Sequence, residues 1–246
     1  MRKTNSRMFR RGMGLILCAA LLFLTSGCLY PRDYTPGQTT NVSAAVRSVE
    51  DAVRRYQEDT GLLPIQNADA SVPVYEKYRI DFAKMKRMGY IEAIPKAAFE
   101  SGGRYIFLIV DEETDPKVRL LDAPVYQAIT DAQRNVEAYM KDHGGKLPAD
   151  SEPYPGFFYL DFKRLGMKRP DIRSMFAPRP LELMADAKGN VYADYGIDLA
   201  QQIRDHNLTP SPDEDLRRIL VERTPFVPVK SPVYRLVEGE IQAVPE

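Results

Sequence analysis

An internal repeat constrains the fold of this chain more than any other feature of its sequence. One helical stripe of apolar residues recurs 83 residues later with the same spacings of 4, 3, 4 and 3, which are typical of an amphipathic helix. The two stripes are Val42, Val46, Val49, Val53 and Tyr56, and then Val125, Ile129, Ala132, Val136 and Tyr139. A chain that repeats a whole helical face is expected to fold as two related units.

Both long helices are expected to end in the same way. Gly61 and Gly144 lie at the same offset, and glycine readily adopts the left-handed conformation that terminates a helix. Pro64 and Pro148 follow and prevent either helix from resuming.

A second match predicts a short helix in each unit. Ile80-Asp81-Phe82 corresponds to Leu160-Asp161-Phe162, and the similarity resumes at Lys86 and Lys163 after a three-residue gap. We expect each short helix to open at the aspartate of its tripeptide, because aspartate is a favoured N-cap.

A β-hairpin is expected to close each unit. The first would pair 105–110 with 118–121, and the second would pair 181–185 with 191–195, each across a turn-forming stretch. Beyond the repeat, Ser211-Pro212-Asp213-Glu214 resembles a capping box that opens a helix. A final hairpin is expected over 233–244.

The sequence therefore predicts an α+β fold. It has two tandem units, each made of a long helix, a short helix and a hairpin, followed by a C-terminal helix and hairpin. The expected divisions are a signal peptide at 1–27, a flexible tether at 28–41, the first unit at 42–123, the second at 124–206 and the C-terminal extension at 207–246.

The first 28 residues have the layout of an export signal. Five basic residues precede an apolar segment from Met13 to Leu24, and no acidic residue occurs before Cys28. The alternative is a transmembrane helix, which needs ~20 apolar residues to cross the hydrocarbon core. The shorter apolar segment favours a signal peptide.

The end of this segment, Leu24-Thr25-Ser26-Gly27-Cys28, resembles the lipobox of bacterial lipoprotein precursors. The resemblance implies that Cys28 becomes the mature N-terminus and carries a thioether-linked diacylglycerol. Two or more acyl chains suffice for stable anchoring, so the expected location is the cell membrane, facing outside the cytoplasm. The whole arrangement also resembles uncharacterised lipoproteins of endospore-forming Gram-positive bacteria.

Residues 29–41 contain prolines and threonines without an apolar period, which favours a flexible tether over an ordered arm.

The net charge of the processed chain limits the kinds of partner that it can bind. Of the 34 basic residues, five lie in the signal segment, so 29 remain against 34 acidic residues and the net charge becomes −5. A mildly acidic surface disfavours nucleic acid as a partner.

The stretch from Tyr56 to Pro64 resembles the end of the long helix in type II secretion pseudopilins and related pilin-like proteins. The chain lacks the prepilin-peptidase glycine with its following Phe and Glu. The resemblance therefore implies a similar soluble fold rather than polymerisation.

Motifs for catalysis are missing from the sequence. His143 and His206 are the only histidines, and the cysteine that would remain after processing is the lipidated one, which disfavours zinc. No G-x-S-x-G, P-loop or G-x-G-x-x-G occurs. The sequence predicts no catalytic residue, no metal site and no cofactor.

Four residues are candidates for ligand binding. Asp81 and Asp161 are repeated carboxylates that would either form a paired site or cap their helices. Tyr154 and Phe157 lie in an aromatic run that would either stack on a sugar or a partner, or pack in the core.

These observations favour a non-catalytic envelope lipoprotein. It would be held by lipidated Cys28 and would bind another envelope protein or a cell-wall polymer. Two alternatives are an envelope-acting hydrolase that uses paired carboxylates and a solute-binding protein with a cleft between its units.

Replacement of the anchoring residue tests the predicted location. Cys28→Ala removes the thiol that would carry the lipid, so the protein should either appear in the medium or remain uncleaved. Fractionation and mass spectrometry of the N-terminus measure this. A correctly trimmed variant that stays in the membrane would contradict lipid anchoring.

Overall fold

The computed structural model describes residues 36–245, and it describes their side chains from Asn41 onward. By its internal contacts, the chain divides into an N-terminal part, Met1–Asn41, and a compact body, Val42–Glu246, which contains both repeat units. The predicted signal peptide, Cys28 and the start of the predicted tether lie outside the described residues. Within the described residues, no helix combines the length and apolarity needed to cross a membrane.

The first helix, α2, spans Pro36–Thr60 and begins inside the predicted tether. The prediction of a flexible segment is therefore wrong for residues 36–41. Proline suits the first helical turn because its missing N–H has no intrahelical partner there. Adding polar turns to an existing helix costs little and leaves no apolar period in the sequence.

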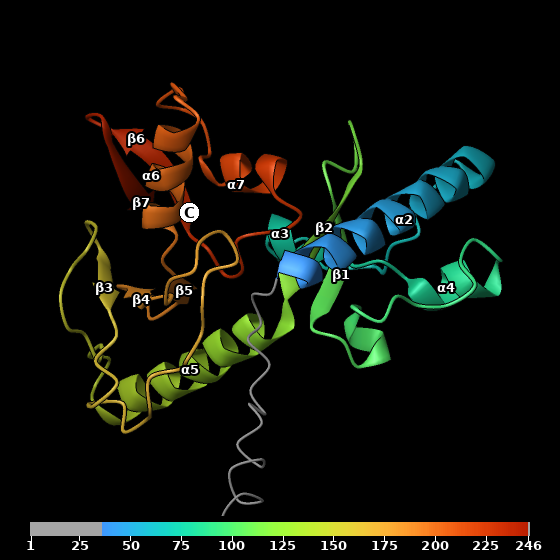
Figure 1. Ribbon diagram of the computed structural model, residues 1–246. Coiled ribbons are helices and arrows are strands. Elements are labelled where there is room, and N and C mark those ends of the chain that lie inside the picture. Colours follow the sequence, from blue (N-terminus) through green and yellow to red (C-terminus); the bar gives the residue numbers. More distant parts are fainter. Residues whose placement is uncertain (1–35, 246) are drawn as a thin grey trace, which may run out of the picture. The chain divides into compact units, whose positions relative to one another are not determined.

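The first unit continues through two short helices into a hairpin (Figure 1). These elements are α3 (Val74–Lys77), α4 (Phe82–Arg87), the 3₁₀ turn η1 (Phe99–Ser101), β1 (Tyr105–Val110) and β2 (Lys117–Asp122). The two strands are antiparallel, and Tyr105 lies opposite Asp122. The predicted hairpin is confirmed.

The second unit and the extension follow directly. They comprise α5 (Ala123–Asp142), β3 (Phe157–Tyr159), β4 (Leu183–Asp186), β5 (Val191–Ala193), α6 (Gly196–Asp205), α7 (Arg217–Arg223), β6 (Val233–Val237) and β7 (Glu240–Val244). Strands β3, β4 and β5 form one antiparallel sheet in that order, and β6 pairs with β7. The predicted α+β class is confirmed.

The repeat is visible in the backbone hydrogen bonds. In each unit, the residue before the repeated aspartate donates to the first strand of the hairpin, and the aspartate N–H donates to the proline carbonyl after the long helix. The bonds are Ile80 to Phe107 (3.0 Å) and Asp81 to Pro64 (2.8 Å), and then Leu160 to Leu183 (3.1 Å) and Asp161 to Pro148 (2.8 Å).

The second short helix is missing from its predicted place. Residues 162–166 form turns, whereas the first unit has the helix α4. Both segments still close a bond of helical span, from Met85 to Asp81 and from Leu165 to Asp161. The second copy is three residues shorter here, so it has room for one turn only.

The C-terminal helix begins later than predicted. The Ser211 N–H donates to the Glu214 carboxylate, and the Glu214 N–H donates to the Ser211 backbone carbonyl, which closes a turn, but α7 starts only at Arg217. The helix α6 was not predicted. The final hairpin is confirmed, and its turn residues Glu238 and Gly239 have φ values of 53° and 86°.

The β1–β2 hairpin is buried on both of its faces. Ile106, Leu108 and Val110 contribute to a core formed mainly with α5, the second sheet and the C-terminal elements. Phe107 and Ile109, which point the other way, contribute to a core with α2 and α4. Because side chains alternate along a strand, one ribbon serves both hydrophobic cores.

This arrangement predicts cooperative unfolding of residues 42–245. Phe107→Ala and Leu108→Ala remove neighbouring buried side chains from opposite cores, and they should cost about 3–5 and about 2–5 kcal/mol of unfolding free energy, respectively. Thermal melts should show a single transition in both variants.

Leu62→Ala is the control, since Leu62 is 66% exposed and its truncation should leave the melting temperature unchanged. Two separate transitions in either core variant would show that the cores unfold independently.

Candidate functional site

The repeated carboxylates cap their own segments. Asp81 accepts a hydrogen bond from the backbone N–H of Lys84 at 2.8 Å. Asp161 accepts from the N–H groups of Lys163 and Arg164, both at 3.0 Å, and forms an ion pair with the Arg164 guanidinium at 3.1 Å. The capping alternative therefore describes both residues, and the hypothesis of a paired carboxylate site is wrong.

The aromatic candidates differ in their surroundings. Phe157 is completely buried and packs edge-on against Tyr192, with ring centroids 5.8 Å apart, so it is a core residue and offers no stacking face. Tyr154 is half-buried and donates its hydroxyl to Asp194 at 3.0 Å. Asp194 lies outside the matched positions of the repeat.

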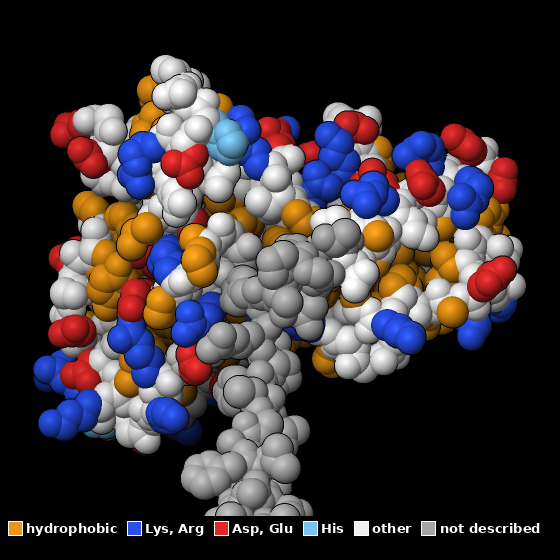
Figure 2. Space-filling view, viewed as in Figure 1, with side chains coloured by type: hydrophobic (Ala, Val, Ile, Leu, Met, Phe, Trp, Pro, Cys, Tyr) orange, Lys and Arg blue, Asp and Glu red, His pale blue; other side chains and the backbone are white. Residues whose placement is uncertain are grey.

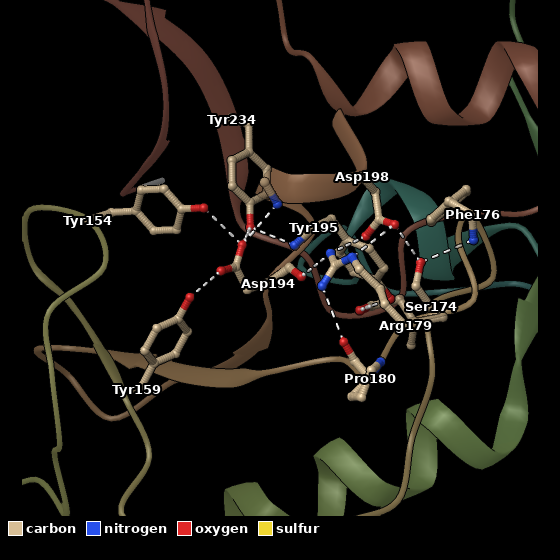
Figure 3. Close-up of polar contacts among 12 residues, drawn as sticks. Tyr154, Tyr159, Ser174, Phe176, Arg179, Pro180, Asp194, Tyr195, Asp198 and Tyr234 are labelled. Carbon is tan, nitrogen blue, oxygen red and sulfur yellow. Dashed lines mark hydrogen bonds and ion pairs between the residues drawn. The ribbon is translucent and has the colours of Figure 1, made fainter. Parts of the chain in front are cut away.

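The Asp194 carboxylate accepts hydrogen bonds from three tyrosine hydroxyls (Figure 3). It lies just after β5, while the hydroxyls of Tyr154, Tyr159 and Tyr234 reach it from both ends of β3 and from β6, over 3.0, 2.7 and 2.8 Å. The carboxylate is 3% exposed and also accepts from the Gly196 N–H at 2.9 Å. Hydrogen bonds to an ionised acceptor are the stronger kind, so this cluster fixes three segments around one point.

The start of α6 needs a glycine at this cluster. A Cβ on Gly196 would lie 2.0 Å from the hydroxyl of Tyr154, far inside contact distance. Any other residue would push Tyr154 away from Asp194. Gly196 therefore lets α6 begin directly beside the tyrosine.

A second buried carboxylate lies one turn further along α6. Asp198 accepts from the Ser174 hydroxyl at 2.9 Å and forms an ion pair with the Arg179 guanidinium. Burial raises the pKa of the Asp198 carboxyl, while Arg179 and Ser174 oppose that rise. A buried carboxylate is stable only with such partners, so Asp198 ties the loop 174–179 to α6.

The tyrosines of the Asp194 cluster are protonated at all ordinary pH values. Burial, followed by the charge of Asp194, raises the pKa of Tyr154 and of Tyr234. Burial and the hydrogen bond to Asp194 raise the pKa of Tyr159. Each hydroxyl must keep its proton in order to donate, so this cluster serves structure rather than acid–base chemistry.

A partly enclosed cavity of about 320 Å³ lies beside α5. Its wall combines three tyrosines with three charged side chains, namely Tyr75, Tyr126, Tyr192, Glu76, Arg217 and Lys230. This volume lies at the small end of the range for small-molecule sites. The wall draws on both repeat units and on the C-terminal extension, so the cavity exists only in the assembled fold.

The charged groups of the cavity are held in defined contacts. The buried carboxylate of Glu76 pairs with the Lys230 ammonium at 3.0 Å. Arg217 lies over the Tyr75 ring, 5.3 Å from its centroid, and holds Asp215 through two guanidinium nitrogens. Such fixed side chains give a site that is preorganised before any ligand enters.

Lys230 has an unusual backbone. Its φ is 50°, in the left-handed region that residues other than glycine seldom occupy. Its carbonyl accepts the Ala193 N–H at 2.9 Å, which holds the segment against β5. Residues in this conformation cost roughly 1–3 kcal/mol and are concentrated at functional sites.

An open groove of about 480 Å³ lies between α6 and the β6–β7 hairpin. Tyr154 contributes to its wall, together with the apolar side chains of Ile197, Leu236 and Ile241. Figure 2 shows hydrophobic side chains gathered on this side of the molecule, between scattered charges. Ile197 is 56% exposed.

Sequence reasoning missed every charged residue of the cavity. Glu76 lies in a stretch between the two matched segments of the first unit, and Lys230 lies in the proline-rich segment before β6. Neither belongs to a periodic pattern or a known motif. The one available signal was a lysine placed among Pro225, Pro228 and Pro232, where a rigid backbone presents a side chain in one direction.

The Asp194 cluster predicts a loss of stability at high pH. The folded-state pKa of Tyr234 is raised above its ordinary value of 10.0, so its contribution is complete below pH 10 and is lost as the pH rises toward the folded value. The free energy of unfolding should fall by up to about 1.4 kcal/mol per pH unit for this one residue. Tyr234→Phe should be less stable than wild type at neutral pH but should show a shallower decline above pH 10.

Tyr139→Phe is the control, because this ring stacks on His143 away from the cluster. Denaturant melts from neutral pH to above 10 measure both slopes. Equal slopes in wild type and Tyr234→Phe would contradict the assignment.

Part of the chain is similar to a known protein family. Residues 42–122 match the model of the YphF family N-terminal domain. The matched range begins at Val42, where the compact body starts, and ends with β2. The chain matches no curated protein and no solved structure. Residues 42–122 are therefore similar to a YphF family N-terminal domain, and the second repeat unit and the C-terminal extension lie outside the matched range.

Proposed function

We propose that this protein is a lipid-anchored, extracytoplasmic binding module that holds a cell-wall polymer through the cavity beside α5. Two kinds of observation support the proposal. The N-terminal sequence has the layout of a lipoprotein signal ending at Cys28. The described fold offers a cavity of about 320 Å³ whose wall mixes aromatic rings with hydrogen-bonding groups.

The residues that line the cavity indicate the kind of ligand that it would bind. Tyrosine rings offer flat apolar faces that suit the C–H faces of a sugar ring, and the polar wall groups suit its hydroxyls. Gln133 offers an acceptor. Its two N–H donors are taken by the Gly189 carbonyl at 2.9 Å and the Glu137 carboxylate at 3.0 Å, and its Oε1, which accepts the Val191 N–H at 2.7 Å, keeps one lone pair for a sugar hydroxyl. A cavity of this size holds one or two sugar units of a longer chain.

The same observations support binding rather than hydrolysis. The paired carboxylates on which an envelope hydrolase would rest are caps of separate segments. The buried Asp194 is surrounded by tyrosine hydroxyls, which hold it as an acceptor. The carboxylate in the cavity wall, Glu76, is held in an ion pair.

Filling the cavity tests the proposal. Thr130 lines the cavity on α5 and is half-buried, so Thr130→Phe should occupy the space that a sugar would take. Binding of the full chain in detergent to purified cell walls, measured by co-sedimentation, should weaken by about tenfold or more.

Gln127→Phe is the matched control. Gln127 lies three residues earlier on the same helix and is exposed, so the same ring there should leave wall binding unchanged. Circular dichroism checks that both variants are folded. Equal wall binding by the two variants would overturn the proposal. So would failure of wild type to bind walls while crosslinking captures one stoichiometric partner protein.

A further inference from the structure

Two cationic side chains lie against one ring at the cavity. The Lys230 ammonium is 5.1 Å from the centroid of Tyr126, and the Arg79 guanidinium carbon is 5.7 Å from the same centroid. Tyr126 itself is part of the cavity wall. Each cation is attracted by the ring, but the two cations repel each other.

The neighbouring carboxylates compensate these charges unevenly. Glu76 pairs with Lys230, and Asp215 pairs with Arg217 through a two-nitrogen contact. Among the ion pairs of the described residues, none includes Arg79. Among the lining side chains, Arg217 and Lys230 are cationic and Glu76 is anionic, so the lining carries one more positive charge than negative charge.

The hydrogen-bonding capacity of the cations is also uneven. Arg217 donates to both oxygens of Asp215 and to the Ser231 carbonyl, so its guanidinium is committed to the fold. Lys230 has three N–H donors, of which Glu76 takes one. Lys230 is thus the better placed cation of the wall for contact with a ligand.

The same geometry selects against positively charged ligands. A ring that already faces two cations is a poor site for a third, so this aromatic pocket is unsuited to an ammonium ligand despite its three tyrosines. An anionic group beside Tyr126 would relieve the repulsion between Arg79 and Lys230. Both the charge balance of the lining and the spare N–H donors of Lys230 therefore favour an anionic ligand.

We propose that the cavity binds an acidic saccharide, with the sugar ring among the tyrosines and the acid group held by Lys230, while Arg79 on the Tyr126 ring adds positive charge beside the wall. This inference rests on the proposed function and specifies its ligand. The acid group can be a carboxylate or a phosphate, since both accept bonds from guanidinium and ammonium groups. The left-handed backbone of Lys230 serves to direct its side chain to this place.

Binding of three related sugars tests the inference. N-acetylglucosamine is the neutral probe, N-acetylmuramic acid adds a carboxylate, and N-acetylglucosamine 1-phosphate adds a phosphate. Titration calorimetry or NMR titration of the full chain in detergent should give at least one acidic probe about tenfold tighter binding than the neutral one. The advantage should shrink at high salt, and comparison of the two acidic probes identifies the acid group.

Charge variants locate the effect. Lys230→Asn should remove most of the advantage of the acidic probe over the neutral probe, and Arg79→Gln, outside the lining, should reduce that advantage by a smaller factor. Asparagine tolerates the left-handed backbone, so Lys230→Asn adds no backbone strain, and circular dichroism checks that the variant folds without the ion pair to Glu76. Glu76→Gln should strengthen acidic binding severalfold, because it removes a competing carboxylate.

Arg134→Gln is the matched control, since Arg134 is an exposed cation of α5 that does not line the cavity and that pairs with Asp131. It should change nothing. Equal binding of neutral and acidic probes by wild type, or an advantage that survives in both Arg79→Gln and Lys230→Asn, would overturn the inference.

The two proposals fail in different ways. If Thr130→Phe abolishes wall binding but charge has no effect, the cavity is the wall-binding site and only the acidic specificity is wrong. If Thr130→Phe leaves both wall binding and probe binding unchanged, the cavity is not the site and both proposals are wrong.

Discussion

Burial of the β1–β2 hairpin on both faces is the constraint on which the rest of the structure depends. A two-stranded ribbon is at best marginal in water by itself, and this one is covered by α2 and α4 on one side and by the second unit on the other. The continuous apolar run from Tyr105 to Val110 suits this position, because strands buried on both faces read as unbroken hydrophobic sequence. Asp122 then ends the ribbon and caps α5, so the second unit starts from a fixed point.

Local pattern made much of the architecture predictable. The heptad-like stripes located both long helices, and the Gly and Pro residues after them located their ends, because helix termination is a local event. Turn residues located all three hairpins. The errors arose where length rather than pattern decides: a three-residue gap reduced the second short helix to a turn, and polar residues extended α2 to Pro36 without an apolar signal.

The candidate site was much less predictable. Its residues come from α3, α5, β5, the start of α7 and the segment before β6, and their proximity is a product of the tertiary fold. Repetition drew attention to Asp81 and Asp161, yet repeated polar residues most often repeat a structural role, which here is capping. Glu76, Lys230 and Asp194 occur once each and belong to no pattern. A charged residue that becomes buried outside any repeat or period cannot be located from the sequence pattern.

The double-sided hairpin also bears on how such proteins can evolve. The match to the family model ends at residue 122, but Leu108 and Leu121 within it are completely buried in one core with residues that follow it. A boundary in sequence similarity is therefore not a boundary in packing. Any lineage that exchanged the second half would have had to supply a complementary apolar surface at the moment of exchange, so the two halves are expected to diversify together, through matched changes across the ribbon, rather than to be shuffled as separate modules.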